Sequence, residues 1–440
     1  MRYIADLHTH SKYARACSKE LTPENIDLLC RIKGIDIVAT GDFTHPKWFA
    51  ELSEKLEPAE EGLYRLKKKF QKTQPQFKEK SPRDVRFVCG TELSCIYKKG
   101  DATRRLHLLV FAPSLEVVKK INDELERRDC NISSDGRPII GLHAEELLQM
   151  LLDIDERNIL IPAHAWTPWF AVFGSKSGFD TIEECFGNLS KHIFAIETGL
   201  SSDPPMNWRV SGLDNVALIS NSDAHSLPNL GREANVFEGD KISYDLLFDG
   251  IRSASPNARC GKKKSLLTLV KTIEFFPDEG KYHYDGHAEC KISLHPKDAI
   301  KKKNMCPVCG RELTIGVLHR VEELADRTEE QKPASVVPFV HSVELEKIIA
   351  DSMGVKGRSS KKVKPIYWDI IERTGGELPF LLDVKSDQLS IIASETVAAG
   401  VRRIREGKIK TIPGYDGVYG IVQIFDDSEK VKKQKTLFGG

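Results

Sequence analysis

Short apolar segments alternate with longer amphipathic segments from residue 1 to about 255, and polar residues cluster where the apolar segments end. This alternation predicts an α/β fold. Seven of the apolar segments have the length of strands, which favours a barrel whose catalytic groups collect on the rim at the strands' carboxyl ends. The predicted strands are 3–6, 35–40, 86–91, 106–112, 159–163, 195–198 and 217–222, and two clear predicted helices are Pro23–Lys33 and Ala144–Ile154.

The remaining chain divides into three further parts. Residues 256–330 hold a basic run and a cysteine-histidine cluster, which predicts a zinc-binding module. Residues 331–425 are mostly helical in pattern, at 343–353, 367–373 and 387–406, and a Gly-rich hairpin signal then precedes a strand at 421–425. Residues 426–440 are charged, which predicts a disordered tail. We therefore expect a catalytic domain at 1–255 followed by three smaller units.

Composition narrows the class of protein. The chain has 65 Lys and Arg against 64 Asp and Glu, a net charge of +1, so local patches must hold any polyanion. The apolar runs are short and the N-terminus opens directly on a strand pattern, so we expect neither a membrane span nor a secretory signal. Ten cysteines, three of them in a metal-type cluster, predict reduced thiols and a cytoplasmic protein.

Histidine and carboxylate side chains recur at the ends of the predicted strands. His8 and His10 follow the first strand, and the alternation of a β extension directs both to the same side. Nitrogen and carboxylate ligands in this mixture suit Zn²⁺, Mn²⁺ or Fe²⁺ better than Ca²⁺, and a lone buried histidine would be weaker evidence. The pattern predicts a metal site drawn from His8, His10, Asp42, Glu92, His107, His164, Asp223 and His225.

A second metal-type pattern lies in the zinc-binding module. His287 and Cys290 are followed, after a gap of fifteen residues, by Cys306 and Cys309, and Gly310 supplies a tight turn. Two such knuckles can close one tetrahedral site, so we predict a structural Zn²⁺. His283 competes with His287 for the fourth position.

The first set of ligands resembles the polymerase and histidinol phosphatase (PHP) family of metallophosphoesterases, whose fold is a distorted seven-stranded barrel with up to three metal ions. The resemblance implies one ion at His8, His10, Glu92 and Asp223, a second at Glu92, His107 and His164, and a third at Asp42 and His225. The family usually has another histidine shortly after the His-x-His. This chain has none there, so Cys17 or water would complete the third site.

Phosphodiester hydrolysis explains why such ligands are needed. Two neighbouring ions generate a hydroxide nucleophile, neutralise the phosphoryl oxygens and stabilise the leaving alkoxide, with Zn²⁺, Mn²⁺, Mg²⁺ or Fe²⁺ as candidates. We expect Asp223 to orient or deprotonate the attacking water, with Glu92, His8 and His10 as its catalytic partners.

The barrel pattern followed by the zinc-binding module resembles endonuclease Q. The segments that carry this resemblance are 196–204, 222–225 with 231–235, 282–309 and 313–327. The resemblance implies a DNA repair enzyme that cuts on the 5′ side of deaminated bases (hypoxanthine, uracil, xanthine) and of abasic sites, leaving a 3′-hydroxyl and a 5′-phosphate.

Selection of a deaminated base requires a flipped nucleotide and polar groups that match it. The candidate DNA or base contacts are Trp166, Trp169, Glu197, Asn207, Ser222, Arg232, Lys262, Lys263 and Lys264. Aromatic residues at this spacing are more often core, and lysine runs are more often solvated surface.

The tail carries Gln434, Leu437 and Phe438, which match the Q-x-x-L-F pattern of short ligands for the bacterial sliding clamp. Two other functions remain open on the sequence. A small-molecule phosphoesterase of the histidinol-phosphatase kind has no evident use for the zinc module, and a non-catalytic DNA-binding protein would retain a degenerate metal centre.

Overall fold

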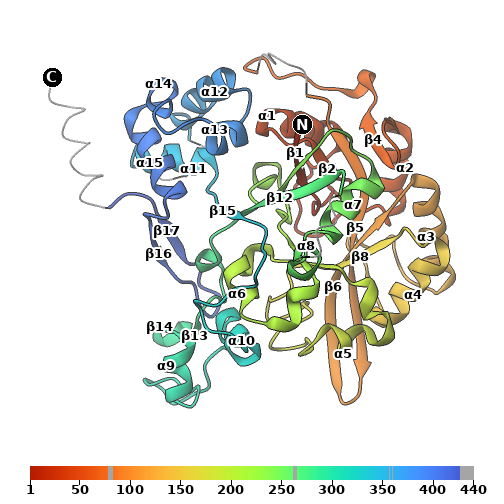
Figure 1. Ribbon diagram of the computed structural model, residues 1–440, viewed down its shortest axis with the longest axis vertical. Coiled ribbons are helices and arrows are strands. Elements are labelled where there is room, and N and C mark those ends of the chain that lie inside the picture. Colours follow the sequence, from red (N-terminus) through yellow and green to blue (C-terminus); the bar gives the residue numbers. More distant parts are fainter. Residues whose placement is uncertain (78–82, 261–264, 356, 359, 427–440) are drawn as a thin grey trace.

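The computed structural model describes residues 1–77, 83–260, 265–355, 357–358 and 360–426 (Figure 1). Its main sheet runs in the order β11, β1, β2, β5, β6 and β8, and β9 and β10 form a separate parallel pair. The backbone N–H of Ala165, just after β8, donates to the carbonyl of Glu197 at the end of β9, 2.9 Å away. The strands therefore curve into a barrel with incomplete hydrogen bonding, and the predicted mixed α/β fold is confirmed. These strands are β1 (Arg2–Asp6), β2 (Ile37–Ala39), β5 (Arg86–Lys99), β6 (Ala102–Ala112), β8 (Ile159–Pro162), β9 (Ala195–Glu197), β10 (Ala217–Ile219) and β11 (Ala234–Gly239).

Helix α1 (Pro23–Lys33) has the bounds that its sequence predicts, and its end residues explain why. Thr22 Oγ1 accepts a hydrogen bond from the backbone N–H of Asn25, and Pro23 occupies the first turn, where its missing N–H costs nothing. Gly34 ends the helix in the left-handed conformation, with φ 90°. Helix α4 (Ala144–Ile154) also matches its prediction. The other helices of this part are α2 (Pro46–Lys55), α3 (Leu115–Arg127), α5 (Ile182–Phe186), α6 (Pro204–Trp208), α7 (Tyr244–Arg252) and α8 (Pro256–Cys260).

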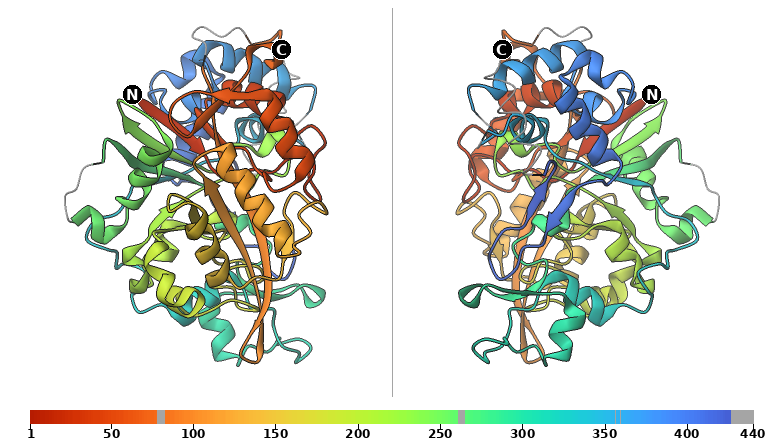
Figure 2. Two further views of the ribbon diagram at one scale, coloured as in Figure 1. Left: turned by 90° about the vertical axis from the view of Figure 1, so that its right-hand side faces the viewer. Right: turned by 90° about the vertical axis from the view of Figure 1, so that its left-hand side faces the viewer.

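Strands β5 and β6 form a hairpin that extends well beyond the two predicted strands and projects from the molecule (Figure 2). Basic side chains at its far end pack on the segment around α5, since the Arg104 guanidinium lies 4.2 Å from the Phe179 ring centre. Charged residues obscured this part of the pattern in the sequence. Smaller strands flank the hairpin or its neighbours: β3 (Leu56–Pro58), β4 (Leu63–Leu66) and β7 (Ile139–Ile140).

The main sheet continues past residue 255, because β12 (Leu267–Glu274) pairs with β11 and β15 (Phe339–His341) pairs with β12. The division into domains at 255, 330 and 425 stays a prediction. The zinc module holds β13 (Asp285–His287), β14 (Ile292–Leu294), α9 (Pro296–Lys301) and α10 (Val317–Leu324).

The C-terminal helices pack around a core of their own that includes Ile348, Ile370, Phe380 and Val401. They lie beside α1, at the opposite end of the molecule from the zinc module (Figures 1 and 2). The predicted helix at 387–406 is divided, because Ser394 caps a new helix by accepting from the backbone N–H of Val397. The elements are α11 (Leu345–Ser352), α12 (Val363–Thr374), α13 (Glu377–Leu382), α14 (Leu389–Ile392), α15 (Glu395–Arg405), β16 (Lys410–Ile412) and β17 (Ile421–Gln423). Within the described residues, no helix has the length and apolar character needed to cross a bilayer.

Candidate metal centre

Two groups of metal-type donors meet at the barrel rim and share Glu92. Glu92 Oε2 lies 3.5 Å from His8 Nε2 and 3.3 Å from His10 Nε2, and Asp223 Oδ1 lies 3.4 and 3.1 Å from the same two nitrogens. Glu92 Oε1 lies 2.9 Å from His107 Nδ1 and 3.1 Å from His164 Nε2. Within each group the donor atoms all lie within 4.8 Å of one another. One carboxylate therefore faces both groups, one oxygen to each.

Strands bring these donors together from distant parts of the chain. His8 and His10 follow β1 and His164 follows β8, whereas Glu92 lies within β5 and His107 within β6. The sequence placed Glu92 and His107 near strand ends, but both strands of the hairpin extend past them. Three of the predicted donors, Asp42, His164 and Asp223, have left-handed backbones with φ 45°, 28° and 44°, although none is glycine. Such conformations cost about 1–3 kcal/mol and concentrate at functional sites.

Hydrogen bonds orient the two histidines of the first group. His8 Nδ1 lies 3.0 Å from Glu197 Oε1, and His10 Nδ1 lies 2.9 Å from Asp42 Oδ1. Each carboxylate holds the Nδ1 proton and leaves Nε2 directed at Glu92 and Asp223, which is the arrangement of an imidazole that binds a metal. His8 Nε2 is buried without a hydrogen-bond partner, so the residues fit a bound cation.

The pKa shifts show how strongly these groups interact. Burial alone would raise the pKa of Glu92, but His107, Arg137 and His8 outweigh it and hold the pKa well below its usual range. Burial likewise opposes ionisation of Asp223, yet His8 and His10 lower its pKa far below normal. Both carboxylates are therefore ionised at neutral pH and available as ligands.

The predicted third group is arranged differently. Asp42 is fully buried, and its Oδ2 accepts from the backbone N–H of Ser11 at 2.6 Å while Oδ1 holds His10. His225 lies nearby, with its ring centre 4.6 Å from that of His10. Among the described residues, no group of three converging donors contains Asp42 or His225. Asp42 orients His10 in this structure, and a third ion stays a prediction.

In the zinc module, the structure groups His287 with Cys290, Cys306 and Cys309. Cys309 Sγ lies 4.0 Å from His287 Nδ1. Burial raises the pKa of the Cys306 thiol, but the backbone N–H groups of Cys309 and Val308 outweigh it and lower the pKa. Three thiols and one imidazole are typical of a structural zinc site. His283, the competing candidate, is 7% exposed and lies in a separate cavity.

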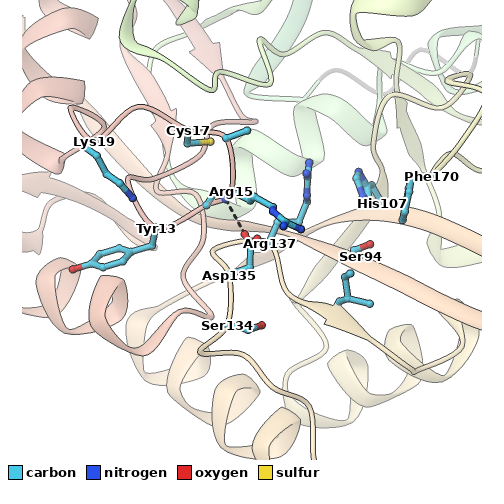
Figure 3. A pocket seen from close by; sticks show the side chains of 13 residues that line it. Tyr13, Arg15, Cys17, Lys19, Ser94, His107, Ser134, Asp135, Arg137 and Phe170 are labelled. Atoms are coloured by element: carbon cyan, nitrogen blue, oxygen red, sulfur yellow. Dashed lines mark hydrogen bonds between the residues drawn. The ribbon is translucent and has the colours of Figure 1, made fainter.

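A cleft of about 830 Å³ opens beside the metal centre (Figure 3). His107 and Phe170 line one side, and the other side carries Arg15, Lys19 and Arg137. Arg137 donates to Glu92 Oε2 at 3.0 Å. These cations could not be identified from the sequence, because each lies in a loop without a recognisable motif.

Two solved structures are similar to this chain over nearly its full length. The chain is similar to the lesion-specific endonuclease PfuEndoQ from Pyrococcus furiosus, with a TM-score of 0.81, 29% identity and coverage of 99% of both chains. It is also similar to endonuclease Q in complex with a 27-mer duplex carrying an abasic lesion, with a TM-score of 0.79, 30% identity and coverage of 98% of both chains. The chain belongs to the endonuclease Q family. The predicted family is thereby confirmed.

Two further comparisons match parts of the chain. Residues 344–408 match the family model of the MJ0043 C-terminal domain. The uncharacterized protein MJ0043 of Methanocaldococcus jannaschii is 33% identical over 260 residues, which are 58% of this chain and 31% of MJ0043. The chain therefore covers about a third of the length of that relative.

The structure separates the candidate base contacts into buried and exposed residues. Trp166 is fully buried and donates through Nε1 to Asn207 Oδ1 at 2.7 Å, so both residues belong to the interior. Ser222 is also buried, and Arg232 Nε donates to its carbonyl at 3.0 Å. Trp169, in contrast, is 39% exposed. Only Trp169 of these presents a large surface to a ligand.

Trp169 lines a second cavity, of about 160 Å³, together with Ser201, Tyr282 and His283. Its ring centre lies 5.3 Å from that of Tyr282 in an edge-on arrangement, and His283 Nδ1 is buried without a hydrogen-bond partner. Tyr282 could not be identified from the sequence as a cavity residue, because its place there depends on contact with Trp169, far away in the chain. Predictions for Lys262, Lys263, Lys264, Gln434, Leu437 and Phe438 lie outside the described residues.

Proposed function

We propose that this protein is a metal-dependent DNA repair endonuclease that cuts the phosphodiester on the 5′ side of a deaminated base or an abasic site, leaving a 3′-hydroxyl and a 5′-phosphate. The main observation behind the proposal is that the two oxygens of Glu92 face two donor groups at the side of a large cleft. The similarity to an endonuclease Q structure with an abasic duplex supports DNA as the substrate.

The donor set fits divalent ions held by His8, His10, Glu92 and Asp223 and by Glu92, His107 and His164. Such ions activate water and neutralise phosphoryl oxygens when bound, and Zn²⁺, Mn²⁺, Mg²⁺ and Fe²⁺ are the candidates. Asp223, which stays ionised because of its low pKa, accepts a hydrogen bond from the attacking water and orients it. Glu197 and Asp42 hold the two histidines in one ring orientation, so the site is organised before substrate binds.

The cavity beside Trp169 is the proposed place for a flipped base. Uracil and hypoxanthine present a ring carbonyl beside a ring N–H, whereas cytosine and adenine present an amine beside an unprotonated nitrogen. A donor and an acceptor in the cavity would match the first pair and leave unpaired polar groups with the second, which can discriminate strongly. The unpartnered His283 Nδ1 and the Ser201 side chain are the candidates, and Trp169 would stack on the base.

We further propose a structural Zn²⁺ at His287, Cys290, Cys306 and Cys309, and a sliding clamp as a partner of Gln434, Leu437 and Phe438. The zinc proposal is supported by the convergence of the four donors. The clamp proposal rests on the sequence pattern of the tail. The free thiols among the described residues support a cytoplasmic location.

A nicking assay tests the main proposal. Labelled duplexes with one deoxyinosine, deoxyuridine or abasic site, and an undamaged duplex, are incubated with Mg²⁺, Mn²⁺ or Zn²⁺ and with wild type or Asp223→Ala. We expect a single nick on the 5′ side of each lesion, absent from the undamaged duplex and from Asp223→Ala. Hydrolysis of a phosphomonoester with all duplexes left intact would contradict the proposal and favour a small-molecule phosphoesterase.

A further inference from the structure

The large cleft beside the metal centre has an unequal distribution of charge. Its lining contains the cations Arg15, Lys19 and Arg137 and a single carboxylate, Asp135. Figure 3 shows the arginines in the cleft between the loop of Cys17 and the residues Ser94 and His107. This wall therefore presents excess positive charge directly next to the metal centre.

Asp135 organises the two arginines through their backbones. Its Oδ1 accepts the backbone N–H of Arg15 at 3.1 Å and that of Arg137 at 3.0 Å. One carboxylate thus holds two separate segments of chain at the same point.

The loop that carries Arg137 is also fixed relative to the metal centre. The backbone N–H of Gly136 donates to the carbonyl of Tyr13 at 3.2 Å. A Cβ at Gly136 would lie only 2.4 Å from Asp42 Oδ2, so the loop passes tightly against the carboxylate that orients His10. Packing therefore holds the backbone of Arg137 at a fixed distance from the catalytic histidines.

The Arg137 side chain has unused donors that face the cleft. One terminal nitrogen donates to Glu92, and within the described residues no hydrogen bond is formed by its other nitrogens. A guanidinium is charged at every working pH. Arg15 is exposed, and its guanidinium has no partner in the described part of the chain. A planar guanidinium matches the oxygens of a phosphate in a bidentate arrangement.

We propose that Arg137, with Arg15 beside it, binds a phosphodiester of the DNA backbone next to the metal centre and positions the strand without reading the base. This inference rests on the proposed function for its substrate. Arg137 is a positioning residue, and a role restricted to neutralising Glu92 is the competing explanation. Arg15 separates the two, because it makes no contact with Glu92.

The test compares Arg137→Met, Arg137→Lys and Arg15→Met with Arg127→Met. Arg127 is exposed on α3 and, among the residues that the structure describes, pairs with Glu124 alone. Each variant is also prepared with Asp223→Ala, so that the lesion duplex is not cut, and binding to a lesion duplex and to an undamaged duplex is measured by fluorescence anisotropy at several salt concentrations without a chelator. We expect Arg137→Met to weaken binding to both duplexes about tenfold and Arg15→Met about threefold. Each should lower the slope of log affinity against log salt by about 0.9, while Arg127→Met changes nothing. Arg137→Lys should keep the salt slope and recover only part of the affinity.

Two further readouts exclude the competing explanation. Metal content per chain should be unchanged in all variants, and the KM for bis(4-nitrophenyl) phosphate should rise in Arg137→Met more than kcat falls. Unchanged affinities, a loss shared by Arg127→Met, or an effect confined to Arg137→Met with lost metal would overturn the proposal. If wild type binds both duplexes equally and nicks neither, the lesion-specific function is overturned, while the variants still test phosphate binding by Arg137 and Arg15. If wild type nicks normally and the variants have unchanged affinities and KM, phosphate binding by these arginines alone is overturned.

Discussion

The barrel metal centre draws its donors from residues 8 to 223, whereas the zinc module draws all four from residues 287 to 309. The barrel donors are held by strands of the main sheet and, for Asp223, by the segment after β10, inside a large apolar core. The module has a small core, with Ala299, Cys306 and Leu313 as its buried residues. The barrel should therefore keep its shape without metal, while the module should depend on its ion for structure.

The largest expected effect comes from Glu92→Gln, which removes the charge that both donor groups share. We expect the nicking rate to fall at least about 10³-fold, because metal ions contribute several kcal/mol to stabilisation of the transition state. Circular dichroism should show an intact fold. A variant within tenfold of wild type would show that the two groups do not work as one centre.

Cys306→Ser tests whether the zinc module depends on its ion for structure. We expect the variant to bind one zinc ion fewer per chain, since structural zinc sites in small modules contribute about 10–16 kcal/mol of apparent folding energy. Limited proteolysis with mass spectrometry should then find new cleavages between residues 285 and 315. Cys130→Ser, whose thiol lies outside the zinc group, is the control. Simultaneous loss of the barrel fold would show that the two sites are not independent.

Asp42→Asn and His225→Ala distinguish a supporting residue from a ligand within the barrel. Asp42 fixes the ring of His10, so we expect a loss of about 10- to 100-fold in metal affinity or activity. His225→Ala should have a smaller effect, since its nitrogens converge with no donor group among the described residues. Isothermal titration with Mn²⁺ or Zn²⁺ measures both. Loss of a whole metal equivalent in His225→Ala would instead support the third ion.

The difference between the barrel metal centre and the zinc module also explains what the sequence could and could not predict. Spacing within a short segment restricts the zinc ligands directly, yet it could not choose between His283 and His287, because the direction of each side chain depends on β13. His8, His10 and His164 were predictable because they follow strands whose ends meet at one rim. Glu92 and His107 lie within the antiparallel strands β5 and β6 instead. Trp166 and Trp169 lie three residues apart, and only the tertiary contact of Trp166 with Asn207 shows that one is core and the other exposed. Arg137 was missed because its importance depends entirely on proximity to Glu92 in space.

A smaller effect, a gain of stability instead of a loss of activity, is expected at a pair of buried carboxylates behind the metal centre. Glu233 and Glu274 flank the directly paired residues of β11 and β12, and both are fully buried. Burial raises the pKa of Glu274 to about 7. Burial and the neighbouring Glu274 raise the pKa of Glu233 well above normal. Neither pair member contacts a metal donor, so their titration should change stability more than catalysis.

Glu274→Gln should therefore stabilise the protein at alkaline pH. The folded state keeps the proton of Glu274 up to about pH 7, whereas the unfolded chain loses it from its ordinary value of 4.5. Wild-type stability accordingly falls as pH rises between these values, and the neutral amide removes that loss. We expect the free energy of unfolding of the variant to match that of wild type near pH 4.5 and to exceed it by about 1–3 kcal/mol at pH 8, measured by urea unfolding. Glu61→Gln, at an exposed position, should show no such trend. A variant less stable than wild type at pH 8 would mean that the Glu274 carboxylate is ionised and stabilising in the fold.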